Sequence, residues 1–171
     1  ELTTYTAVYM TIGATWLLDR VTEEPVEPNY RYAQLQPLEW LTGTWYDDLG
    51  DMTVRIECQW AANNRYISRA YLVEGGESDA SGLQIIAWDP RQQTIRSWLF
   101  DSAGGFVSGV WTQRGERWFV QSTATLPDGG AGSFTSVFRL VDENSIGWQK
   151  TNQVIDGELL PNVDEVIITR Q

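Results

Sequence analysis

The sequence contains no histidine, one cysteine and no long run of apolar residues. The absence of histidine excludes Ser-His-Asp and Cys-His nucleophilic sites, histidine-ligated zinc and a haem held by a proximal histidine, all within this chain. A single cysteine cannot form an internal disulfide or a CxxC site. No apolar run approaches the roughly 18–20 residues that a membrane-spanning helix needs. The sequence therefore predicts no cofactor.

Basic residues are also scarce: 12 lysines and arginines stand against 23 acidic residues, which gives a formal net charge of −11. Nucleic acids and anionic membrane surfaces are poor partners for such a chain, because they would be repelled rather than attracted. The 171 residues are 42% hydrophobic and 20% charged, an ordinary globular composition. This length suits one domain with a sizeable core, or one domain with an appendage.

The single cysteine lies in an alternating segment, residues 54–60, on the same side as Val54, Ile56 and Trp60. This pattern predicts that Cys58 is a small buried apolar residue. The alternative, a reactive thiol, lacks a neighbouring histidine to activate it.

The chain divides at a linker. Residues 3–12 and 15–21 are strand-like runs joined by Gly13-Ala14, so residues 1–21 are predicted to form a β-hairpin. An isolated hairpin is marginal in water, and we therefore expect it to dock on something, a second copy of the chain included. Residues 22–34 contain two prolines among acidic residues and are predicted to form an extended connector. Residues 35–171 form the remaining domain.

Within residues 35–171, strand-like segments recur at short intervals, and every break between them contains Gly, Asn, Asp or Pro. The predicted strands are residues 43–47, 52–60, 65–74, 82–88, 94–101, 105–113, 117–126, 132–141, 145–153 and 162–170. Connections this short cannot form parallel crossovers, so sequential strands should pair antiparallel. A flat sheet of about ten strands would expose its edges. We therefore predict an all-β fold, an antiparallel up-and-down barrel of the lipocalin-like or calycin type, preceded by a short helical turn at 35–41.

Nine tryptophans are spread along the chain, and seven of them fall in separate predicted strands. Spaced in this way they favour packing in the core and at the rim of the barrel. An aromatic-lined cavity is the alternative.

Two segments resemble a known family. They are residues 38–45 (LEWLTGTW) and residues 88–111 (WDPRQQTIRSWLFDSAGGFVSGVW). Together they look like the uncharacterised lipocalin-like bacterial domains of the DUF1579 type, in which an LxxLxGxW opening precedes a (Y/W)DP…W…DS.G hairpin. The matching positions are turn and packing residues. The resemblance therefore implies a fold for residues 35–171 and no chemistry.

Residues 4–21 (TYTAVYMTIGATWLLDRV) resemble the last two strands of a SnoaL-like (NTF2-like) domain. The composite is similar to bacterial proteins of the SgcJ/EcaC type, in which such a domain precedes the barrel. This resemblance implies that most of the first domain, with any active site in it, lies outside this chain. Nitrobindin-type haem barrels share the barrel architecture, but their histidine ligand is missing here. Fatty-acid-binding proteins and lipocalins also share this architecture, but a shared fold does not show that this chain binds their ligands.

Several polar and aromatic residues in mid-strand positions are candidates for contact with a ligand. Trp98 and Trp111 lie on adjacent predicted strands and would form one aromatic wall if they shared a face. Arg96 would then present its guanidinium to a carboxylate inside the cavity, and the alternative is an outward, solvated Arg96. The predicted ligand-binding residues are Arg96, Trp98, Trp111, Gln84 and Arg69. Arg55 and Lys150 are further mid-strand polar residues, and Glu57 is expected to pair with Arg55 or Arg69.

The sequence predicts no catalytic residue and no metal site. Asp47, Asp48 and Asp51 cluster in one turn but lack the spacing of a calcium loop, so a solvated turn is expected. Asp89-Pro90 is a turn starter, and Asp101-Ser102 is expected to form an Asx-type turn or, alternatively, a polar rim.

Three functions remain open from the sequence. The leading prediction is a non-catalytic barrel that binds a small, partly apolar ligand. The second is an interaction or oligomerisation domain accessory to a SnoaL-like enzyme domain, which an exposed apolar patch would favour. The third is a barrel enzyme, an isomerase or hydrolase using carboxylates or arginine, which needs a buried carboxylate of raised pKa in a cleft. Localisation stays open: the first four residues are not a signal n-region, and export after removal of an upstream signal is compatible with the sequence.

Overall fold

The structure of this chain is a computed structural model that describes residues 3–12, 15–25, 30–48, 50–76 and 78–171. It divides into two compact units, Glu1–Tyr30 and Arg31–Gln171. Gly13 and Ala14, the predicted hairpin turn, and residues 26–29 of the predicted linker lie outside the described residues.

The first unit is a pair of strands, β1 (Thr3–Ile12) and β2 (Thr15–Pro25). They pair antiparallel as predicted, with a register shift between Val8 and Tyr9. β2 continues to Pro25 and so includes part of the segment predicted as an extended connector. Proline is tolerated there, because the end of an edge strand needs no N–H donor.

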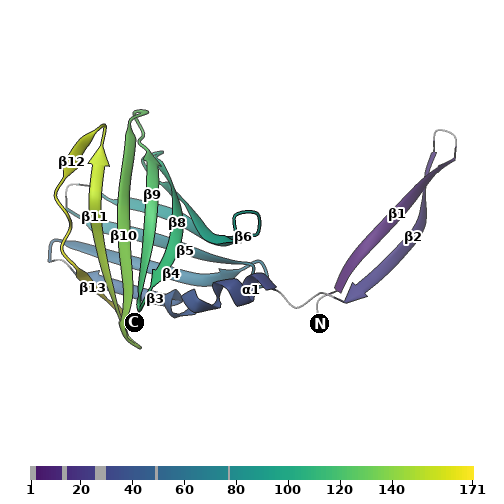
Figure 1. The fold of residues 1–171 in the computed structure, drawn as a ribbon, viewed down its shortest axis with the longest axis horizontal. Coiled ribbons are helices and arrows are strands. Elements are labelled where there is room, and N and C mark those ends of the chain that lie inside the picture. The colour runs from purple at the N-terminus through teal and green to yellow at the C-terminus, as the bar shows by residue number, and fades with distance from the viewer. Residues whose placement is uncertain (1–2, 13–14, 26–29, 49, 77) are drawn as a thin grey trace. The chain divides into compact units, whose positions relative to one another are not determined.

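The second unit begins with a short α-helix, α1 (Tyr30–Leu35), which continues into a 3-10 helix, η1 (Gln36–Leu41). Ten strands follow that form a closed antiparallel barrel, as predicted. Its strands are β3 (Gly43–Asp48), β4 (Met52–Ala61), β5 (Tyr66–Gly75), β6 (Ala80–Asp89), β7 (Thr94–Asp101), β8 (Phe106–Arg114), β9 (Arg117–Thr125), β10 (Ala131–Asp142), β11 (Ser145–Ile155) and β13 (Val166–Arg170). In Figure 1 these strands curve round one another, with the helical segment along the lower end of the barrel.

Sequential strands from β3 to β11 pair in order, and β13 closes the barrel between β11 and β3. The last predicted strand, residues 162–170, was too long. A three-residue strand, β12 (Glu158–Leu160), pairs with β11 outside the barrel, and the closing strand starts only at Val166. Pro161 follows β12 directly and cannot donate a ladder hydrogen bond, which separates the two strands.

The helical segment and the start of β3 close one end of the barrel. Leu38 and Leu41 are buried, and Trp45 on β3 donates its indole N–H to the Leu41 carbonyl at 2.7 Å. Arg170, near the end of the chain, lies against the same cluster, with its guanidinium carbon 4.2 Å from the centroid of the Trp45 ring. This end, which we call the closed end, is therefore held by residues from both termini of the barrel domain.

Alternate residues of each strand point into the barrel. At the closed end they form a solid apolar core in which Trp111 stacks on Phe138 with ring centroids 5.5 Å apart. Trp118 meets the same ring of Trp111 edge-on at 6.3 Å. Core packing, the favoured interpretation of the tryptophans, is confirmed for Trp45, Trp111 and Trp118, which are all buried. Above this core the interior is not filled.

Candidate functional site

A cavity of about 440 Å³ lies inside the barrel. Each of the ten barrel strands contributes at least one inward side chain to its wall. Most of these side chains are apolar, as Val54, Leu99 and Phe134 illustrate, because β-branched and aromatic residues favour strands. A volume of this size is within the range of small-molecule sites, roughly 300–1,000 Å³.

The most buried cation of the cavity is Arg69 on β5. It lines the cavity and also a void of about 10 Å³ among residues of the closed-end core such as Leu41 and Trp45. Its Nη1 donates to Oε1 of Gln84, the residue opposite it on β6, at 3.4 Å. The guanidinium carbon is 5.6 Å from the centroid of the Phe138 ring. Burial lowers the pKa of Arg69, because the surroundings solvate its charge poorly.

The second cation is Lys150 on β11, the only lysine in the chain. Its Nζ is 4.5 Å from the centroid of the Phe134 ring, and its neighbour across the strand pair is Ser136 on β10. Burial lowers the pKa of Lys150 as well. Within the described residues, none of the ion pairs involves Arg69 or Lys150.

Two acidic groups act on the cavity wall, and neither forms an ion pair within the described residues. Asp47 lines the cavity, and its pKa is raised mainly by burial. Asp101, at the end of β7, accepts the backbone amides of Ala103 and Gly105 at 2.9 Å each, which is the predicted Asx-type turn. Tyr71 also lines the cavity, and its pKa is raised, first by burial and then by the charge of Asp101.

Three serine hydroxyls add to the polar wall. Ser97, Ser122 and Ser136 are 2%, 7% and 8% exposed, although all three line the cavity. Ser97 accepts the indole N–H of Trp111 at 3.0 Å. Gly109 lies opposite both Ser97 and Ser122, and a Cβ there would come within 2.9 Å of the Ser97 oxygen. The lack of a side chain at Gly109 thus leaves room for these hydroxyls.

The structure separates the predicted ligand-binding residues into three groups. Arg69 and Gln84 line the cavity and contact one another. Trp111 points inward but is buried in the closed-end core, where its ring supports the cavity from below. Arg96 and Trp98 lie on the outer face of β7, because Ser97 and Leu99 take the inward positions. The expected aromatic wall of Trp98 and Trp111 is therefore wrong, since the two rings are on opposite faces.

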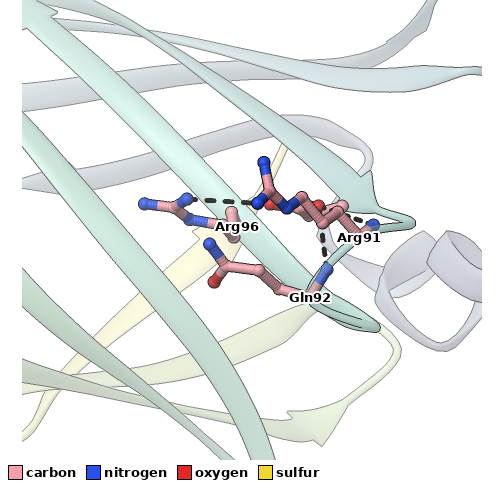
Figure 2. Close-up of polar contacts among 4 residues, drawn as sticks. Arg91, Gln92 and Arg96 are labelled. Carbon is pink, nitrogen blue, oxygen red and sulfur yellow. Dashed lines mark hydrogen bonds and ion pairs between the residues drawn. The ribbon is translucent and has the colours of Figure 1, made fainter.

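Arg96 instead belongs to a surface cluster. Its guanidinium is 3.7 Å from the carboxylate of Asp89 and lies over the Trp98 ring at 5.4 Å. Asp89 also accepts the backbone amides of Arg91 and Gln92, as expected for a turn starter, and these bonds lower its pKa. Figure 2 shows Arg96 beside this turn.

Sequence reasoning missed the serines as cavity residues, although pairing identifies them. On β9, the face of Trp118, Val120 and Ala124 is more apolar than the face of Arg117, Phe119 and Gln121, which marks it as the inward face. Ser122 shares the inward face. Gly109 on β8 lies opposite Ser122, and Ser97 on β7 lies opposite Gly109, so these two residues also face inward.

Cys58 is buried, as predicted, and burial raises its pKa to about 11. Arg55 pairs with Glu57 on the outer surface, one of the two expected pairings.

Searches against protein-family models and curated proteins find no match to this chain. Among the described residues, no helix is long and apolar enough to cross a bilayer. The same residues contain no cluster of three or more His, Cys, Asp or Glu side chains able to hold a metal ion.

Proposed function

We propose that the barrel binds a small, partly apolar ligand in its central cavity and catalyses no reaction itself. The observation that supports this most strongly is the unfilled space of about 440 Å³ on which side chains from every barrel strand converge. Interiors are normally packed to the density of organic crystals, so a space of this size is unusual in a domain whose other half is solidly packed. Apolar walls with a few placed polar groups are the composition of ligand sites.

A pair of matched variants on β8 tests this function. Val107 lines the cavity, whereas Phe106, one residue away, is 49% exposed on the outer face. Val107→Trp should fill part of the cavity and abolish binding of small apolar fluorescent probes. Phe106→Trp should leave binding unchanged. Native mass spectrometry of the wild-type protein would detect a co-purified ligand. Equal probe binding by both variants, or none by the wild type, would contradict the proposal.

We further propose that residues 35–171 belong with the DUF1579-type lipocalin-like domains, and that residues 1–21 are the end of a SnoaL-like domain. The ten-strand barrel with its preceding helical segment supports the first part, and the pairing of β1 with β2 supports the second. Both are likenesses of fold, so they contribute no ligand and no activity.

A second function, an interaction surface, is favoured by a row of apolar side chains on the outside of the barrel. Leu83, Phe100 and Phe106 are opposite one another on β6, β7 and β8, and they are 47%, 58% and 49% exposed. The rings of Phe100 and Phe106 are 6.5 Å apart. Neighbouring exposed apolar side chains of this kind mark contact surfaces.

Sedimentation velocity at several protein concentrations tests this surface for self-association. A dimer that Phe100→Ser dissociates would support the second function. Leu159→Ser is the control, because Leu159 is 76% exposed on β12, outside the barrel. A monomer at every concentration would exclude self-association through this row.

A further inference from the structure

We propose that the ligand is an organic anion whose carboxylate, or a similar oxyanion, is held by Arg69 and Lys150 while its apolar body lies against the valine and aromatic walls. This inference rests on the ligand-binding function proposed above and specifies the chemistry of the ligand.

The charges in the cavity do not balance. Arg69 and Lys150 line it together with one carboxylate, that of Asp47, which pairs with neither of them in the described part of the chain. Burying a cation costs several kcal/mol unless a partner compensates the charge. The lowered pKa values of Arg69 and Lys150 reflect this cost. An anion inside the cavity would offset it, whereas water filling the same space solvates the cations but supplies no opposite charge.

The two charged nitrogen groups of the cavity wall, those of Arg69 and Lys150, can only donate hydrogen bonds, whereas the serine hydroxyls can donate and accept. Of the five guanidinium N–H groups of Arg69, one is donated to Gln84. The Lys150 ammonium and the hydroxyls of Ser122 and Ser136 have no hydrogen-bond partner among the described residues. The amide oxygen of Gln84 already accepts from Arg69. A ligand that accepts hydrogen bonds satisfies this set, and a ligand that mainly donates them does not.

The two cations, which come from β5 and β11, lie over residues of a third strand, β10. Phe134, Ser136 and Phe138 are successive inward residues of β10, so their Cα atoms are spaced about 6.6 Å apart. Arg69 lies over Phe138, and Lys150 lies over Phe134 opposite Ser136. An acid group above Ser136 would therefore have a cation on each side and a hydroxyl beneath it. The two phenyl rings would flank its first carbons.

The test compares two fluorescent probes that differ in charge. Anilinonaphthalene sulfonate is anionic and N-phenyl-1-naphthylamine is its neutral counterpart, and both report an apolar cavity. Wild-type protein should bind the anionic probe about 10- to 100-fold more tightly than the neutral one, since hydrogen bonds to charged groups are worth about 1.5–3 kcal/mol each. Decanoate should displace the probe, and decanol should not. Decyl phosphate distinguishes a carboxylate site from a phosphate site.

Three methionine variants locate the effect. Arg69→Met and Lys150→Met should each remove most of the preference for the anion while retaining the neutral probe, which also shows that the barrel is folded. Arg55→Met is the control, because Arg55 lies on the outer surface paired with Glu57. A wild-type protein that binds both probes equally would overturn the anion inference and leave ligand binding intact. Binding of neither probe would overturn the proposed function itself.

The single lysine gives an independent readout. Reductive ¹³C-dimethylation labels Lys150 and the N-terminal amine only, because the chain has no other lysine. Addition of decanoate should raise the pKa of Lys150 in an NMR titration, since a carboxylate stabilises the ammonium form. An unchanged titration curve at saturating decanoate would contradict the role of Lys150.

Discussion

Replacement of Arg170 by alanine should destabilise the barrel strongly, because this side chain connects the last strand of the barrel to the segment that precedes its first strand. Arg170 donates to the carbonyl oxygens of Thr42 at 2.7 Å, Glu143 at 3.1 Å and Trp40 at 3.4 Å. Its guanidinium also lies over the Trp45 ring. β13 and β3, the pair of strands that close the barrel, are matched at only two positions, Arg170 with Trp45 and Thr169 with Tyr46. Two other hydrogen bonds also cross this seam, from the Thr169 hydroxyl to the Tyr46 carbonyl at 3.3 Å and from the Gln171 amide to the Thr44 carbonyl at 3.0 Å.

The magnitude follows from these contacts. Hydrogen bonds from a charged group contribute about 1.5–3 kcal/mol each and a partly buried cation–π contact about 1 kcal/mol. The longest bond is weak and Arg170 is only half-buried, so we expect a loss of about 3 kcal/mol rather than the full sum. For a domain of this size that lowers the melting temperature by about 10 °C. Arg170→Lys keeps the charge but not the planar fork, and should lose about half as much.

Thermal and urea unfolding followed by tryptophan fluorescence measure this loss. Arg55→Ala is the matched control, since Arg55 and Glu57 form an ion pair in which the side chains are 48% and 56% exposed. Exposed pairs contribute about 0–1 kcal/mol. Melting temperatures of the Arg170 and Arg55 variants within about 2 °C of each other would refute the reasoning.

Three further outcomes are expected. Lys150→Met should raise stability by about 1 kcal/mol in denaturant titrations, because it removes a buried charge. The folded-state pKa of Lys150 is lowered from 10.5, so between that lowered value and pH 10.5 this lysine binds more protons in the unfolded chain, and the stability of the wild type should rise with pH relative to that of this variant. Gly109→Ala should cost about 1–3 kcal/mol, since its Cβ would come within 2.8 Å of Val120 and 2.9 Å of Ser97. Iodoacetamide should modify Cys58, whose pKa is raised to about 11, only after unfolding; rapid labelling of the native protein would contradict its burial.

The strands could be predicted from the sequence because alternation and turn chemistry are local. Residues 94–101 coincide with β7, and most other predicted strands end within two residues of those observed. The antiparallel pairing of sequential strands could also be predicted, because the connections between them are too short for parallel crossovers. The closing strand could not be placed in the same way, because the contact of Arg170 with Thr42 joins residues 128 positions apart. No local pattern marks such a pair.

The inward faces were harder to predict than the strands. On β7, one face carries Thr94, Arg96, Trp98 and Phe100, and the other carries Ile95, Ser97, Leu99 and Asp101. Each face therefore holds two apolar and two polar residues, and a rule that places the more apolar face inside cannot choose between them. Register resolves the ambiguity, since a strand with a clear alternation such as β9 determines the faces of its neighbours. The residues of the candidate site can therefore be predicted from the sequence only when the pairing of the strands is known.

The barrel interior has two unlike parts. The closed end buries Leu38, Trp45 and Trp111 in a solid core and carries the Arg170 contacts. The middle keeps an open cavity and two cations, where well-packed apolar residues would be as stable or more so. The chain has a net charge of −11, yet its only lysine lies inside, away from the acidic surface that would stabilise it best. The anion proposed as the ligand would account for a cation held in a place that lowers stability.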